Sequence, residues 1–112
     1  MLVEDHADSA ELLAELLESK GHTVRIAGTA RDALACAAEE PFDLVVSDVG
    51  LPDATGYELM QQLRDQFSLK GIALTGTRMT EAMRDSGFIA YLPKPIALRT
   101  LEQTLESFAR TL

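Results

Sequence analysis

Acidic side chains follow two apolar stretches of this sequence, and a hydroxyl and an ammonium group follow two others. Asp48 comes shortly after one such stretch, and the acidic pair Glu4-Asp5 follows the apolar start of the chain. Thr75 and Lys94 end later stretches of the same kind. Adjacent carboxylates repel one another unless they are solvated or bound to a cation, and a hard divalent ion relieves that repulsion. A hydroxyl and an ammonium group can donate hydrogen bonds to an anion.

The apolar stretches themselves predict the strands that position these groups. Leu44-Val45-Val46 is short, contains β-branched residues and lies between Pro41 and Gly50, as expected for a strand buried on both faces. A strand of that kind belongs inside a parallel sheet, and ligands collect in the crevice beyond the carboxyl ends of such strands. We expect the other strands at residues 1–3, 23–26, 72–75 and 88–95.

Helical spacing of apolar residues predicts helices between these strands and after the last one. The first helix follows a capping box at residues 8–11, and the second begins at the capping residue Thr29. Their alternation with the strands predicts an α/β, flavodoxin-like, doubly wound five-stranded parallel sheet, (βα)5. The apolar faces expected on the sheet are Leu12, Leu13, Leu16 and Leu17, then Ala33, Leu34, Ala37 and Ala38, then Tyr57, Leu59, Met60 and Leu63, and finally Leu98, Leu101, Leu105, Phe108 and Leu112.

Composition excludes several classes of function. The chain of 112 residues is long enough for one domain, and its net charge of −8 disfavours direct binding to nucleic acids and anionic lipids. No apolar run is long enough for a membrane span, and the amino end lacks the features of a signal peptide. Cys36 is the single cysteine, which fits a cytoplasmic protein and favours a buried apolar role over redox chemistry.

The string from Ser47 to Leu59 closely resembles the phosphoacceptor loop of response-regulator receiver domains, the phosphorylatable modules of two-component signalling. The resemblance implies that Asp48 accepts a phosphoryl group. It also implies that Glu4, Asp5, Asp48 and the backbone carbonyl of Gly50 hold one Mg²⁺ ion. His6 lies beside the acidic pair, but Mg²⁺ prefers oxygen ligands, so we interpret His6 as a solvent-facing loop residue. Gly56 matches a loop glycine of that family, whose physical use is a left-handed conformation or another conformation that does not tolerate a side chain.

Further matches to the receiver family lie near the ends of the last two strands. Thr75 resembles the switch threonine, whose hydroxyl meets the phosphoryl oxygens, and Lys94 resembles the lysine that places its ammonium against them. The Lys94-Pro95 bond is cis in that family, and X-Pro is the linkage in which a cis bond costs least. Tyr91 matches the aromatic switch position, although an ordinary edge-strand tyrosine is the alternative.

A departure from the family falls between Thr75 and Lys94. These residues are 19 positions apart, shorter than in typical receivers by about one helical turn. We therefore expect a shortened fourth helix within residues 80–86. In receivers this helix contributes to the dimer and output face, so at most a weak homodimer is expected.

These matches lead to one functional expectation and one rival. Residues 1–112 would form a single receiver domain, excised from a longer chain, that takes a phosphoryl group from a histidine kinase or histidine phosphotransfer domain and catalyses its own phosphorylation and dephosphorylation. The resemblance favours the receiver of a hybrid histidine kinase. A receiver-like docking module that does not turn over phosphate is the alternative. A dinucleotide-binding domain is excluded because a glycine-rich turn is missing after the first strand.

Overall fold

In the part of the chain that the structure describes, five parallel strands form one sheet in the order β2-β1-β3-β4-β5. The strands are β1 (Leu2–Val3), β2 (Ile26–Ala27), β3 (Val45–Asp48), β4 (Gly71–Thr75) and β5 (Phe88–Pro93). The computed structural model describes residues 1–76, 86–94 and 96–110. This strand order is that of the flavodoxin-like doubly wound fold, so the predicted fold class is confirmed.

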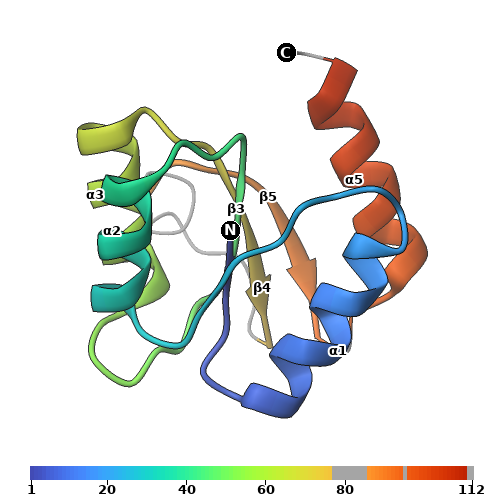
Figure 1. The fold of residues 1–112 in the computed structure, drawn as a ribbon, viewed down its shortest axis with the longest axis horizontal. Helices are drawn as coiled ribbons and strands as arrows, with labels where there is room; N and C mark the ends of the chain where they lie inside the picture. Colours follow the sequence, from blue (N-terminus) through green and yellow to red (C-terminus); the bar gives the residue numbers. More distant parts are fainter. Residues whose placement is uncertain (77–85, 95, 111–112) are drawn as a thin grey trace.

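Helices cover both faces of the sheet, as Figure 1 shows. α1 (Ala7–Glu18) and α5 (Leu98–Arg110) lie on one side, whereas α2 (Ala30–Glu39) and α3 (Gly56–Phe67) lie on the other. Each face of the sheet therefore has its own apolar core. None of the helices in the described part of the chain is both long and apolar enough to cross a bilayer.

The central strands are apolar on both sides because they supply both cores. Val45 packs into the core that contains residues of α2 and α3, and Val46 packs into the core that contains residues of α1 and α5. In β4, Ile72 and Leu74 face the second of these cores, and Ala73 faces the first. Side chains alternate across a strand, so a run without polar residues is what a sheet covered on both faces requires.

The start of α1 differs from the prediction. Asp8 lies inside the first turn of the helix, and the N-cap is His6, whose side chain makes no capping hydrogen bond. The buried face is formed by Ala10, Ala14 and Leu17, whereas Leu12 is 60% exposed. Small residues allow the helix backbone to approach the sheet, so the predicted leucine face was only partly right.

The other elements agree with the prediction more closely. The hydroxyl of Thr29 accepts a hydrogen bond from the backbone N–H of Asp32, which confirms the cap of α2. Ala38 is exposed, however, and β2 begins only at Ile26. Residues 80–85 of the expected fourth helix lie outside the described residues, and so its predicted shortening is outside them as well. Ser86, the last residue expected in that helix, lies in a turn. Pro95 and Leu112 are also outside the described residues.

Candidate functional site

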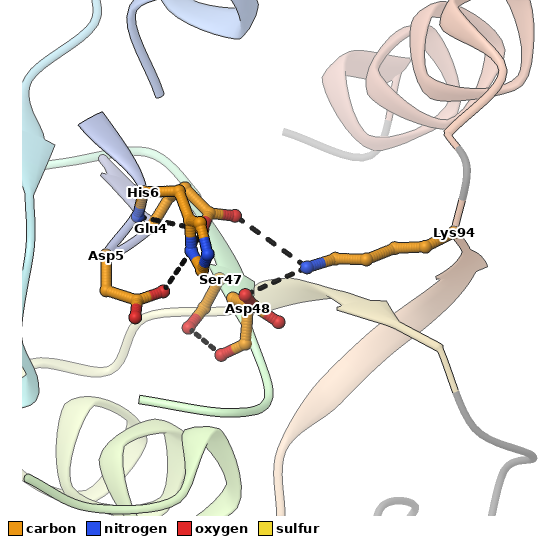
Figure 2. A network of polar contacts seen from close by, with 6 residues as sticks. All are labelled: Glu4, Asp5, His6, Ser47, Asp48 and Lys94. Atoms are coloured by element: carbon orange, nitrogen blue, oxygen red, sulfur yellow. Dashed lines mark hydrogen bonds and ion pairs between the residues drawn. The ribbon is translucent and has the colours of Figure 1, made fainter. Parts of the chain in front are cut away.

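Four of the predicted site residues, Glu4, Asp5, Asp48 and Lys94, lie together at the carboxyl edge of the sheet (Figure 2). Glu4 follows β1, Asp48 and Thr75 are the last residues of β3 and β4, and Lys94 follows β5. The strands are parallel, so their carboxyl ends lie at one edge, and the N–H of Lys94 extends the pairing by donating to the Thr75 carbonyl at 2.8 Å. The fold thus brings together groups at the carboxyl ends of four separate strands.

Lys94 joins two buried carboxylates. Its Nζ lies 2.9 Å from Oδ2 of Asp48 and 3.8 Å from Oε2 of Glu4. The side chains of Asp48 and Glu4 are only 12% and 8% exposed, whereas that of Lys94 is 38% exposed. Burying a charge is costly unless it is paired, so the ammonium group offsets part of the cost of placing two carboxylates together.

The pKa values at the site reflect this crowding. Burial raises the pKa of the Glu4 carboxyl, and the neighbouring charge of Asp48 adds to the effect, against the opposing influence of the His6 N–H and Lys94. Burial lowers the pKa of Lys94, but the hydrogen bond and charge of Asp48, together with Glu4 and Asp5, outweigh it and leave this pKa above its usual value. Burial thus dominates the shift of Glu4, whereas the neighbouring carboxylates decide the direction of the shift of Lys94.

Asp5 and His6 form the open side of the site. The His6 ring is exposed, as predicted, but its Nδ1 lies 3.1 Å from Oδ1 of Asp5, a contact the sequence did not reveal. The backbone N–H of His6 donates to Oε1 of Glu4 at 3.2 Å. The hydrogen bond with His6 lowers the pKa of Asp5 and raises that of His6.

The donor set fits a hard divalent cation. Ligand atoms of Glu4, Asp5 and His6 lie within 4.8 Å of one another. Asp48 is not part of that cluster, but its charge acts on Glu4, and Nζ of Lys94 contacts the carboxylates of both residues. Carboxylate oxygens are the ligands that Mg²⁺ prefers. At Gly50 an added Cβ would meet no atom within 4 Å, so a side chain there would have room.

Gly56 closes the loop that follows Asp48. Its N–H donates to the Val49 carbonyl at 2.6 Å, and Gly50 pairs with Thr55 across the loop. A Cβ at position 56 would lie 2.5 Å from the backbone oxygen of Asp48. Gly56 does not have a positive φ, so the left-handed conformation named in the prediction is absent at this residue. The position still excludes a side chain, and the reason is close approach of the backbone.

Thr75 and Tyr91 lie near the ends of β4 and β5. Thr75 is buried at the last position of β4. Tyr91 is half-buried against the core beneath α2 and α3, with its ring edge-on to that of Phe88 at a centroid distance of 5.9 Å. These positions are compatible with the predicted switch pair.

Two polar residues near the site were missed by sequence reasoning. The buried hydroxyl of Ser47 donates to the backbone carbonyl of Asp48 at 2.9 Å. Asp53 accepts hydrogen bonds from the backbone N–H groups of Ala30 and Arg31 at 2.9 and 3.0 Å. Asp53 caps a helix that precedes it by more than 20 residues, so no local sequence pattern indicates its role.

Comparison with known proteins agrees with this fold and site. The family described as "Response regulator receiver domain" matches residues 1–106, and the chain belongs to that family. It is a receiver domain of two-component response regulators.

Individual relatives are found both as separate regulators and within kinases. The chain is 34% identical over 97% of its length to "Sensor histidine kinase RcsC" of Salmonella typhimurium, of which it spans 12%. It is 32% identical over 96% of its length to "Polar-differentiation response regulator DivK" of Brucella ovis, of which it covers 93%.

Solved structures show the same architecture. A CheY-like receiver domain from Methylobacillus flagellatus has a TM-score of 0.88 and 33% identity, with 96% of this chain and 94% of that one covered. A two-component response regulator from Clostridium difficile has a TM-score of 0.92 with 97% and 93% covered, and its 22% identity supports the fold alone.

Proposed function

We propose that this domain takes a phosphoryl group from a phosphohistidine onto Asp48 and changes conformation in response. The observation that carries the proposal is the pairing of a buried carboxylate at the sheet edge with the Lys94 ammonium 2.9 Å away, beside a second buried carboxylate. A nucleophile, a cation for the transferred oxygens and an acidic pair for a metal are the parts that phosphoryl transfer needs.

Asp48 is the nucleophile in this proposal. One oxygen of its carboxylate attacks phosphorus, forming a P–O bond while the P–N bond of the phosphohistidine breaks and the imidazole leaves with the electron pair. The contact between Lys94 and Oδ2 holds the carboxylate in place before the reaction. Afterwards the same ammonium group pairs with phosphoryl oxygens as a compact point charge. Attack of water on phosphorus later releases phosphate and restores the carboxylate.

Glu4, Asp5, Asp48 and the carbonyl of Gly50 would hold Mg²⁺. When bound, the ion neutralises charge on the incoming phosphoryl group. The protein's own contribution is to keep these oxygen donors together in spite of their repulsion. The pKa of Glu4 is raised first by burial, and the charge of Asp48 adds a smaller contribution. A second cation beside Lys94 would lower that repulsion further.

The proposed switch connects the site to the rest of the domain. The Thr75 hydroxyl, buried at the end of β4, would donate to a phosphoryl oxygen that exists only after transfer. Movement of Thr75 would then allow Tyr91 to turn inward. The phosphodonor would be a histidine kinase or a histidine phosphotransfer domain, and the similarity to a sensor histidine kinase supports a hybrid-kinase receiver. The domain would act in the cytoplasm.

The test is the intact mass of the protein after incubation with Mg²⁺ and acetyl phosphate. We expect a phosphoryl adduct that requires Mg²⁺ and disappears in Asp48→Asn. Asp43→Asn is the matched control, because Asp43 is an exposed aspartate just before β3, at the strand's other end. Full labelling of Asp48→Asn would refute the assignment. A folded, Mg²⁺-binding protein that takes no phosphoryl group even from a phosphorylated histidine phosphotransfer domain would favour a docking module.

A further inference from the structure

The loop between β3 and α3, residues 49–55, is fastened at both its base and its tip. At the base, the N–H of Gly56 donates to the Val49 carbonyl at 2.6 Å, and Gly50 pairs with Thr55. At the tip, Asp53 reaches across to the N-terminus of α2. The loop carries Gly50, so its position decides where the Gly50 carbonyl lies.

Asp53 holds the α2 terminus with both carboxylate oxygens. Oδ1 accepts from the N–H of Ala30 at 2.9 Å, and Oδ2 accepts from the N–H of Arg31 at 3.0 Å. The first N–H groups of a helix have no acceptor within the helix, and the helix dipole favours an anion there. These two donors also lower the pKa of Asp53, which keeps its carboxylate charged.

The cap of α2 is shared between two residues with different partners. Thr29 accepts the N–H of Asp32 at 3.0 Å, so it caps the helix from its own preceding segment. Asp53 caps the two preceding positions from a separate loop. Thr29 therefore stabilises α2 alone, whereas Asp53 also ties the loop to α2.

α2 is a firm support for this contact. Ala30, Ala33 and Cys36 are buried on its inner face, and the helix packs beside α3 (Figure 1). The support thus belongs to the apolar core on that side of the sheet. A loop that is hydrogen-bonded to α2 is therefore held in a fixed position relative to that core.

We propose that Asp53 is a positioning residue that fastens the β3–α3 loop to α2 and thereby holds the Gly50 carbonyl where it completes the cation site. The inference rests on the proposed function, since it concerns the same Mg²⁺ site. Asp53 acts through the loop and does not touch the phosphoryl group.

The test compares Asp53→Ala with Thr29→Ala in a titration with Mg²⁺, followed by NMR of the backbone amides. Both changes remove a cap from α2 and lower the Tm. We expect only Asp53→Ala to weaken Mg²⁺ binding, by about tenfold, as is typical when a group that orients a metal ligand is lost. Asp53→Asn should fall between, because its amide oxygen can accept one of the two hydrogen bonds. Equal Mg²⁺ affinity in Asp53→Ala and the wild type, or equal weakening in both alanine variants, would overturn the proposal.

Amide hydrogen exchange without Mg²⁺ separates this inference from the proposed function. We expect Asp53→Ala to speed exchange of the Gly56 amide, which closes the loop, and Thr29→Ala to leave that amide unchanged. Unchanged exchange in both variants would refute the fastening. If the wild-type protein bound no Mg²⁺, the proposed function and the role of Asp53 at the cation site would both be refuted. The exchange rates would still show whether Asp53 orders the loop.

Discussion

A methyl group added at Gly56 tests how closely the loop after Asp48 is packed. In Gly56→Ala the new Cβ would lie 2.5 Å from the backbone oxygen of Asp48 and 2.8 Å from Cα of Val49. Both atoms belong to the backbone, so neither can move aside as the end of a flexible side chain could. Non-bonded carbon atoms approach to about 3.5–4.0 Å, so the loop or the helix must move by roughly 1 Å.

Two opposing free energies decide whether Gly56→Ala stabilises or destabilises the domain. Overpacking of this kind costs about 1–3 kcal/mol. Alanine gains at most about 1 kcal/mol over glycine from helix propensity and from lower entropy of the unfolded chain. We therefore expect a net loss of about 1–2 kcal/mol and a fall in Tm of about 4–8 °C. A displacement of about 1 Å at a reacting group can cost about a hundredfold in rate, so phosphorylation should slow by about 10- to 100-fold.

The assay pairs thermal unfolding with the rate of Mg²⁺-dependent labelling by acetyl phosphate. Gly28→Ala and Gly50→Ala are the controls, because a Cβ at either position would meet no atom within 4 Å. Gly28→Ala should leave both measurements close to the wild type, and Gly50→Ala should leave the Tm close to it. A Gly56→Ala protein with unchanged Tm and unchanged labelling rate would refute the reasoning.

Two further predictions concern the charges of the site. Lys94→Gln removes an ammonium group that lies 2.9 Å from Asp48 and 3.8 Å from Glu4. We therefore expect tighter Mg²⁺ binding but slower phosphorylation. Weaker Mg²⁺ binding in a titration would contradict this prediction. Burial raises the pKa of Glu4 above its usual 4.5. Between pH 4.5 and the raised value, the folded protein therefore holds a proton on Glu4 that the unfolded chain has released. The contribution of Glu4 to the free energy of unfolding should fall as the pH rises through this range. Glu4→Gln should remove this contribution to the pH dependence of the free energy of unfolding, measured by urea unfolding without Mg²⁺. The same pH dependence in Glu4→Gln and the wild type would argue against the prediction.

The strands of this fold could be predicted because their signal is both local and strong. β3 and β4 are apolar on both faces, and the polar residues that end them fall where a parallel sheet collects its functional groups. Asp48 was therefore indicated by the strand that it ends, whereas the roles of Thr75 and Lys94 came from the resemblance to receiver domains.

Features that depend on tertiary contacts were predicted less well. A local capping pattern suggested that α1 starts near Asp8, but the turn after β1 places the N-cap at His6. The spacing of the leucines suggested an apolar face that included Leu12. In the structure Leu12 is exposed, and the smaller Ala10 and Ala14 are buried instead. The cap that Asp53 provides for α2 joins segments 22 and 23 residues apart, so propensity and periodicity could not reveal it.

The strand order has a consequence for how the chain becomes competent during folding. Asp48 ends a central strand, whereas Lys94 follows β5 at the edge of the sheet, 46 residues later in the chain. Contacts between distant segments form slowly because a long loop must close first. A growing or partly folded chain therefore carries its carboxylates without their ammonium partner. Only docking of β5 on β4 brings Lys94 to these carboxylates, so phosphorylation at its full rate requires that the sheet be complete.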